Sequence, residues 1–367
     1  MKILHVVNSL DPGGMENGVV NLARGLESRG FETHVACLER RGVFSGRLPA
    51  SSKVLLLGKS GGFSPGAAWR LARAITQLRP DVIHSHNLGP LIYSGLATAG
   101  GRRCPWLQGE HSQLTAEERL PRRLRQRRWL YRGCHTIHTV STAMREELVA
   151  CGFPAQKIVA IANGVDTGRF APGGRIAARA ALGVPPDALC IGIVGRFGPF
   201  KRHRQLIEAF EQIVPRLPRA RLLIAGGGGS EEAAVHQRVQ ASSFRPLIHL
   251  AGFQNEPRAC YQAMDLLVVP SINEGLSNAA LEAMACGVPA LVRSGCGHEQ
   301  IITHGHDGWI AGLDSSADLA GSLAEILAEP IRLVDFGRNA RKKVTSHFSL
   351  ESMITSYEHL YRASAPR

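Results

Sequence analysis

The sequence predicts an α/β protein with two domains, each built on a parallel sheet with helices on both faces. Three observations support this prediction. The chain has 367 residues, more than a single hydrophobic core usually holds. Short apolar segments typical of buried strands alternate with segments of helical periodicity, which is the pattern of parallel sheets. The alternation stops at the turn-rich segment 163–174 and then begins again, so we expect domains at 1–168 and 169–349.

The first domain is expected to begin with a strand, a glycine turn and a helix. The strand covers 2–8, the turn contains Gly13 and Gly14, and the helix ends at Gly30. This order of elements is used to hold phosphate groups, although a glycine pair after a strand is more often only a tight turn. Further strands are expected at 33–38, 54–57, 82–86, 106–111, 136–140 and 158–162. Helices are expected between several of them, for example at 65–78 and 142–150.

The second domain is expected to repeat the alternation. Its strands are predicted at 189–195, 221–225, 247–252, 266–269 and 290–292. Helices are predicted at 205–214 and 231–240, the latter opening from a glycine loop at 226–229. From Asp318 onward the chain is expected to be helical, with a last helix from 350. In open α/β sheets ligands bind outside the carboxyl ends of the strands, so residues just after these strands are the first candidates for a site.

The stretch from Glu274 to Val292 carries the strongest local signal for binding. It follows the strand predicted at 266–269 and opens a helix that closes at Cys286. The first N–H groups of a helix have no partner inside the helix and favour an anion. These groups are expected around Leu276, Ser277 and Asn278, and Gly275 is counted with them as a donor-binding residue. Glu274 lies in the loop before the helix and Glu282 inside it. Since two carboxylates flank an anion site, the expected ligand carries hydroxyl groups as well as negative charge, as a nucleotide sugar does.

The net charge of +13 is concentrated in the first half of the chain. Residues 1–168 contain 22 Lys and Arg against 12 Asp and Glu. Much of the excess lies in the segment 119–132, where apolar side chains interleave with arginines. Such a segment can bind nucleic acid or anionic lipid, or it can be an ordinary solvated helix face. The residues considered for a membrane or acceptor surface are Arg122, Arg123, Arg125, Arg127, Arg128 and Trp129.

The remaining composition favours a protein of the cytoplasm. The N-terminal segment lacks the order of regions found in a signal peptide, and no apolar run reaches the roughly 18 residues that cross a bilayer. The eight cysteines are scattered without a C-x-x-C pair, which suits reduced thiols better than disulfides or a zinc site.

Several motifs in their order along the chain resemble retaining glycosyltransferase family 4. The motifs are the glycine pair in DPGGMENG, VSTAMREELVACG followed by NGVD, GRFGPFK at 195–201, and E-x7-E at 274–282. The resemblance covers nearly the whole chain and implies the GT-B architecture, in which two Rossmann-like domains face each other across a cleft. It also implies that the last helix, about 350–367, packs back onto the first domain. The opening NSLDPGGMENGVVNL is similar to members that serve bacterial exopolysaccharide assembly.

The resemblance assigns roles to individual residues. Arg196 and Lys201 would hold the donor diphosphate, Glu274 the hydroxyls of the donor sugar, and Glu282 the ribose. Phe253 falls where relatives contact the base, although a core aromatic is nearly as good an interpretation. His111 matches a histidine beside the transferred sugar, and Gly13 and Gly14 would approach the phosphate. His84 and His86, in HSHN, are left out of the catalytic set. The sequence has no D-x-D motif, so Arg196 and Lys201 are expected to replace a metal ion, and no cofactor is expected.

The implied reaction is retaining transfer of a hexose from a UDP- or GDP-linked sugar to a saccharide or lipid-linked saccharide. The acceptor would bind the first domain, and the protein would associate with anionic lipid on the cytoplasmic face of the membrane. Three alternatives remain open at this point. They are a nucleotide-sugar 2-epimerase of the same architecture, a nucleic-acid-binding protein, and a nicotinamide oxidoreductase, for which Gly13-Gly14 lacks the full G-x-G-x-x-G motif.

Overall fold

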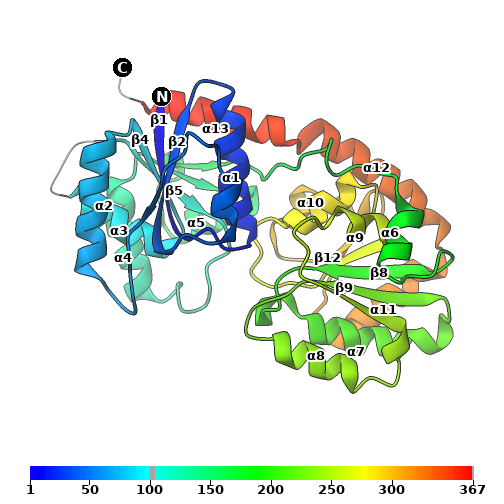
Figure 1. The fold of residues 1–367 in the computed structure, drawn as a ribbon. Helices are drawn as coiled ribbons and strands as arrows, with labels where there is room; N and C mark the ends of the chain where they lie inside the picture. Colours follow the sequence, from blue (N-terminus) through cyan, green and yellow to red (C-terminus); the bar gives the residue numbers. More distant parts are fainter. Residues whose placement is uncertain (100–103, 366–367) are drawn as a thin grey trace. The chain divides into compact units, whose positions relative to one another are not determined.

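A computed structural model describes residues 1–99 and 104–365, which fold as two compact units. The first unit comprises 1–164 together with the C-terminal segment from Leu350, and the second comprises Val165–Ser349. The boundary therefore falls inside the turn-rich segment. Each unit contains one parallel sheet with helices on both faces, so the predicted α/β class with two Rossmann-like domains is confirmed (Figure 1).

The first unit has a seven-stranded sheet in the order β3-β2-β1-β4-β5-β6-β7. Its strands are β1 (Lys2–Ser9), β2 (Glu32–Arg40), β3 (Val54–Leu56), β4 (Val82–His86), β5 (Trp106–Glu110), β6 (Thr136–Thr139) and β7 (Ile158–Ala160). Its helices are α1 (Gly14–Glu27), α2 (Pro65–Leu78), α3 (Leu88–Thr98), α4 (Pro121–Gly133), α5 (Thr142–Ala150) and α13 (Leu350–Ser364). The helix after the glycine turn thus begins at Gly14 itself, with Gly13 as its N-cap.

Alternate side chains of these strands build separate cores on the two faces of the sheet. One core joins Leu4, Ile83 and Ile137 to the apolar sides of α2, α3, α4 and α5. On the other face, Ile3 and Val82 pack against α1 and α13. The two faces therefore differ in which helices cover them, and α13 covers the same face as α1.

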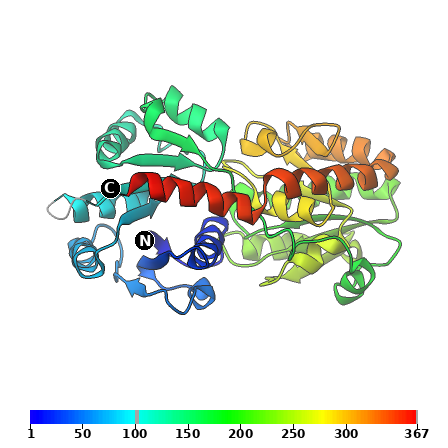
Figure 2. The same cartoon turned by 90° about the horizontal axis from the view of Figure 1, so that it is seen from above.

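The C-terminal helix α13 lies beside α1 in the first unit (Figures 1 and 2). A Cβ atom on Gly25 would lie 2.1 Å from Cδ1 of Ile354, so glycine is needed for this close approach. Arg29 forms ion pairs with Glu351 and Glu358 of α13. Residues 366–367, the end of the expected helix, lie outside the described part of the chain.

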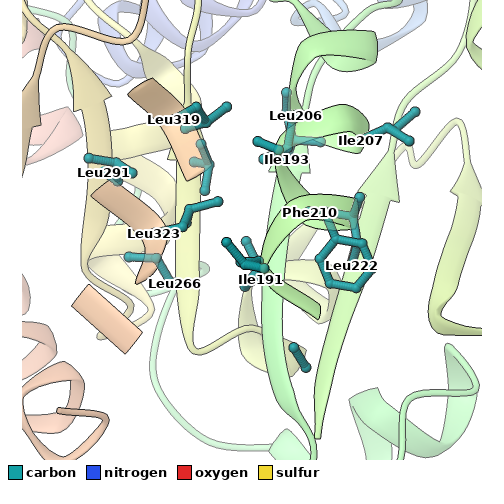
Figure 3. Close-up of a cluster of buried hydrophobic side chains, with 14 of the residues drawn as sticks. Ile191, Ile193, Leu206, Ile207, Phe210, Leu222, Leu266, Leu291, Leu319 and Leu323 are labelled. Carbon is teal, nitrogen blue, oxygen red and sulfur yellow. The ribbon is translucent and has the colours of Figure 1, made fainter. Parts of the chain in front are cut away.

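The second unit has a six-stranded sheet in the order β10-β9-β8-β11-β12-β13. Its strands are β8 (Leu189–Val194), β9 (Ala220–Ala225), β10 (Ile248–Gly252), β11 (Leu266–Val269), β12 (Ala290–Arg293) and β13 (Gly308–Ala311). Its helices are α6 (Arg175–Ala181), α7 (His203–Ile213), α8 (Glu232–Gln240), α9 (Arg258–Ala263), α10 (Asn278–Ala285), α11 (Ser316–Ala328) and α12 (Ile331–His347). The main core lies between the sheet and α7, α8 and α11. Figure 3 shows Leu206 of α7 beside Ile193 of β8, and Phe210 beside Leu222 of β9.

The chain carries eight free cysteines, as its spacing pattern predicted. Within 1–99 and 104–365, every helix is too short or too polar to serve as a membrane span.

Candidate active site

The sequence-predicted residues of the second unit gather where strand order reverses. β8 lies between β9 and β11, so successive connections run to opposite sides at this point, and ligands of open α/β sheets bind at such a reversal. Lys201 ends the short turn Pro199–Lys201 after β8, and Glu274 follows β11. The Lys201 ammonium group donates a hydrogen bond to Oε1 of Glu274. The sheet therefore joins two residues that are far apart in the sequence into one charged pair.

Glu274 stays ionised although it is largely buried, with its side chain 17% exposed. Burial raises the pKa of Glu274, but the charge and hydrogen bond of Lys201 lower it by more. The resulting pKa is below the ordinary value. A buried carboxylate with one oxygen on a lysine keeps acceptor capacity for a ligand hydroxyl. The pair thus offers a cation and a hydrogen-bond acceptor at the same place.

His298 lies near this pair and was missed by the sequence analysis. It follows β12 in the turn Gly297–Gln300 and is fully buried. Neither ring nitrogen has a hydrogen-bond partner among the described residues. Burial lowers its pKa, so the ring is neutral at pH 7. Its place after a strand next to β11 was the available signal.

The loops after β8 and β9 touch each other through their backbones. The N–H of Phe197 donates to the carbonyl of Gly228 at 3.0 Å. A Cβ atom on Gly226 would lie 2.0 Å from the carbonyl oxygen of Gly195. The glycine loop at 226–229 therefore supports the loop that carries Arg196, whose side chain is exposed at the strand ends.

α10 begins at Asn278, inside the stretch from which the sequence predicts a helix. Ser277 is the N-cap, and its hydroxyl accepts a hydrogen bond from the N–H of Ala280 at 3.3 Å. Glu274 lies before the helix, and Glu282 lies within it. Tyr261 donates its hydroxyl hydrogen to Oε2 of Glu282 at 2.6 Å, so this carboxylate is oriented by α9 rather than simply solvated. Tyr261 is a further residue that the sequence analysis missed.

Phe253 follows β10 and is 50% exposed. A Cβ atom on Gly227 would lie 3.0 Å from the Cβ atom of Phe253, so Phe253 lies at the edge of the glycine loop. The interpretation of Phe253 as a core aromatic is therefore wrong. An exposed ring at the strand ends is available for stacking.

In the first unit, the predicted residues follow β1 and β5. Gly13 and Gly14 form the start of α1, where the carboxylate of Glu16 lies against Gly13. His111 comes directly after β5, and its backbone N–H donates to Oδ1 of Asn87 at 3.3 Å. Burial lowers the pKa of His111 to about 4, so its imidazole is neutral at pH 7. Its Nε2 lies 2.9 Å from Nδ1 of His86, one of the two histidines left out of the catalytic set.

The basic segment forms α4 and does not present all of its arginines to solvent. Arg122, Arg125 and Arg128 are exposed, and the ring of Trp129 is 64% exposed. Arg127 is only 1% exposed. Its guanidinium group forms ion pairs with Glu110 and Glu118 inside the unit. The prediction that Arg127 faces a membrane or an acceptor is therefore wrong, because its charge is already used in the core.

Two family models match the chain, one on each unit. Residues 12–169 match Glycosyltransferase Family 4, and residues 175–343 match Glycosyl transferases group 1. Among curated proteins, the chain is 26% identical to D-inositol 3-phosphate glycosyltransferase 2 of Catenulispora acidiphila, with 92% of this chain and 87% of that protein covered. It is 25% identical to D-inositol 3-phosphate glycosyltransferase of Mycolicibacterium smegmatis, with 97% and 89% covered.

Solved structures share the fold over the whole chain. The Anabaena protein Alr3699/HepE in complex with UDP-glucose has a TM-score of 0.87 at 21% identity, with 99% of this chain and 100% of that chain covered. Sucrose-phosphate synthase from Thermosynechococcus elongatus has a TM-score of 0.84 at 20% identity, with 99% and 98% covered. Both carry the two-domain architecture that the motif order implied.

Proposed function

We propose a donor, a stereochemical course and an acceptor class for this chain, which belongs to the glycosyltransferases with the GT-B fold. The donor is a nucleoside-diphosphate hexose, with UDP as the first candidate and GDP as the second. The hexose is transferred with retention of configuration to a saccharide or lipid-linked saccharide. The observation that carries the proposal is the Lys201–Glu274 pair at the strand-order reversal, where a cation and a hydroxyl acceptor stand together.

The chemistry of each side chain suits one part of such a donor. Lys201 and the exposed Arg196 bind the diphosphate and stabilise its charge as it leaves the sugar. Glu274 accepts hydrogen bonds from sugar hydroxyls, and Glu282, oriented by Tyr261, accepts those of the ribose. The start of α10 adds N–H groups. UDP is placed first because the similar Anabaena protein was solved with UDP and with UDP-glucose.

The reaction we propose breaks the bond between the anomeric carbon and the phosphate oxygen, and forms one from that carbon to the acceptor oxygen on the same face. The departing phosphate oxygen takes the acceptor proton. His111, neutral at pH 7, contacts the transferred sugar, and Gly13 and Gly14 approach the phosphate. Two fixed cations supply the charge that a divalent metal supplies elsewhere, so we propose turnover without added metal. The anomeric configuration of the product, read by NMR, checks retention.

Binding of the nucleotide tests the donor assignment. UDP is expected to raise the melting temperature, because a ligand that binds only the folded state stabilises it by about 2.7 kcal/mol at about 100 Kd. GDP is the parallel sample. If neither nucleotide shifts the melting temperature, the donor assignment fails. Turnover of the nucleotide sugar without any acceptor would instead favour the 2-epimerase.

The Phe253→Ala variant tests whether the base of the nucleotide binds beside Phe253. Stacking on an aromatic ring contributes about 1–3 kcal/mol per base, so the Kd for UDP should rise by about 10-fold or more. The fold should be unaffected because the ring is half exposed. Phe63→Ala is the control, since Phe63 is an exposed ring of the first unit at 64% exposure. Equal Kd values in the two variants would remove Phe253 from the site.

The exposed face of α4 supports our proposal that the acceptor is used at the cytoplasmic face of a membrane, as in exopolysaccharide assembly. Arg122, Arg125 and Arg128 stand with Trp129 on this face. Each basic residue near an anionic bilayer contributes about 1 kcal/mol, and the attraction is screened by salt. A water-soluble polyol phosphate, the acceptor class suggested by the names of the curated relatives, is the second candidate.

Vesicle co-sedimentation tests this face. The protein is expected to bind vesicles that contain phosphatidylserine, and to be released as salt rises. Replacing Arg122, Arg125 and Arg128 by glutamine should weaken binding by about 10-fold or more. A charge-matched control replaces three exposed arginines of the second unit, Arg216, Arg245 and Arg332. If both triple variants bind alike, α4 is not the membrane face; binding to nucleic acid with equal salt dependence would also count against it.

A further inference from the structure

Five histidines lie together on one face of the first unit's sheet. His5 lies on β1, His84 and His86 on β4, His138 on β6, and His111 follows β5. They alternate with apolar residues that face α2–α5, so they point to the side covered by α1 and α13. Four of the five are at most 2% exposed, and only His111 is half-buried.

Hydrogen bonds divide these rings into two separate chains. In the His111 chain, Nε2 of His111 is 2.9 Å from Nδ1 of His86, and Nε2 of His86 is 3.0 Å from Nδ1 of His5. In the tyrosine chain, the hydroxyl of Tyr361 is 2.7 Å from Nδ1 of His84, and Nε2 of His84 is 2.8 Å from Nε2 of His138. The hydroxyl of Tyr357 lies beside the ring of His138, 3.3 Å from Nδ1 and 3.5 Å from Nε2. Only the first chain reaches His111.

The rings of the His111 chain are neutral, because burial lowers the pKa of each of them. A neutral imidazole has one N–H donor and one bare nitrogen acceptor. All bonds of the chain must therefore point in the same direction, and two directions are possible. In one, each ring donates toward His5; in the other, each ring donates toward His111.

The buried end of the chain decides between the two directions. Nε2 of His5 has no hydrogen-bond partner among the described residues. If the rings donate toward His5, this nitrogen carries an N–H with no acceptor, and orphaned buried N–H groups are rare in proteins. If the rings donate toward His111, Nε2 of His5 is an acceptor without a hydrogen. A buried acceptor without a partner costs less free energy than a buried N–H without one. The second direction leaves the hydrogen of His111 on Nδ1.

We propose that His86 and His5 are positioning residues that hold His111 in its Nδ1–H tautomer, so that His111 presents a hydrogen-bond donor to the sugar site. This inference rests on the role proposed above for His111. Gly109 makes the arrangement possible, since a Cβ atom there would lie 2.9 Å from Nε2 of His111 and 2.4 Å from Nε2 of His138. The tyrosine chain has a different consequence: it fastens α13 to the sheet.

A metal ion is the competing explanation for the same nitrogens. The ligand atoms of His86, His111 and His138 lie within 4.8 Å of one another. Tetrahedral zinc at 2.0–2.1 Å needs ligand nitrogens about 3.3 Å apart, whereas the hydrogen-bonded nitrogens of neighbouring histidines are 2.8–3.0 Å apart. Among the described residues, no carboxylate groups with these nitrogens to balance a cation. The distances favour hydrogen bonds.

The first test reads the tautomers without any assay of activity. Long-range proton–nitrogen NMR of the histidine rings in the full, untagged chain at pH 7 should show Nδ1 of His111 protonated and Nε2 bare. The same assignment is expected for His86. A protonated Nε2 on His111, or a doubly protonated ring, would overturn the proposal. Ring signals that change when EDTA is added would replace it with the metal site. Because no turnover is measured, failure here is distinct from failure of the proposed function.

The second test uses a pair of variants of similar shape. His86→Leu removes the donor, and a misplaced His111 should lower kcat by about 100-fold with little change in the KM for the donor. His86→Asn keeps an N–H near the position of Nδ1 and should recover most of that loss. Tyr361→Phe is the control, because it breaks a buried bond to a histidine of the other chain; it should lower the melting temperature and leave kcat near the wild-type value. Equal kcat for His86→Leu and His86→Asn would sink the proposal, as would an equal loss in Tyr361→Phe.

Discussion

Replacing Lys201 by alanine is expected to lower the turnover number by about 100- to 1,000-fold, the cost of removing one preorganised donor from a site of developing charge. The variant removes a cation from the diphosphate and also leaves the buried carboxylate of Glu274 without the lysine that pairs with it. The pKa of Glu274 should then rise, because the charge of Lys201 is the main factor that lowers it against burial. Steady-state kinetics on the folded variant give the effect.

Lys343→Ala is the matched control for that variant. Lys343 and Asp307 form a pair in the same unit at 3.0 Å, with side chains 21% and 2% exposed. Loss of this pair should destabilise the unit while turnover stays close to wild type. If Lys201→Ala and Lys343→Ala lower the melting temperature alike and both turn over normally, Lys201 is a structural residue and the site assignment is wrong.

The fold could be predicted largely because apolar runs mark buried parallel strands. The segment at 266–269 is a continuous apolar run bounded by turns, and the segment at 82–86 begins with two β-branched apolar residues; both are strands. β13 (Gly308–Ala311) was not predicted, since it is short and flanked by histidine, glycine and aspartate. α6 and α9 were also missed. Both helices are short. In addition, α6 buries the charged side chain of Arg179, which donates hydrogen bonds to Asp265 and to backbone carbonyls.

The site was predictable where strand ends determine position. Lys201 and Glu274 follow adjacent strands, so the rule for open sheets brings them together. His298 also follows a strand next to β11, but it was not assigned because a lone histidine gives no sign of which way its ring points. Arg127 was predictable in principle. It shares one helical face with Leu124 and Tyr131, at spacings of three and four residues. This spacing indicates a buried face, but the many arginines of the segment favoured the prediction of an exposed one.

Replacing Arg127 by methionine is expected to lower the free energy of unfolding by about 3–5 kcal/mol, the usual cost of leaving a buried charge without its partner. Nη1 of Arg127 lies 2.7 Å from Oε1 of Glu110, which also accepts hydrogen bonds from Tyr131 at 2.7 Å and Gln108 at 3.0 Å. Burial lowers the pKa of Arg127, but the nearby carboxylates raise it above the ordinary value, so the guanidinium stays charged. Urea unfolding at pH 7 measures the change. Trp106, which lies with Glu110 on β5, is a buried fluorescent reporter.

Two further variants separate a buried charge from the loss of side-chain packing. Arg125→Met removes an exposed arginine of the same helix and should change the free energy of unfolding by no more than about 0.5 kcal/mol. The double variant Arg127→Met, Glu110→Gln removes the two fully buried charges and should recover most of the stability, because the remaining carboxylate, Glu118, is partly exposed. If the double variant is as unstable as Arg127→Met alone, packing around the guanidinium is the cause. If Arg127→Met lowers the free energy of unfolding by less than about 1 kcal/mol, the ion pair does not hold α4 to the sheet.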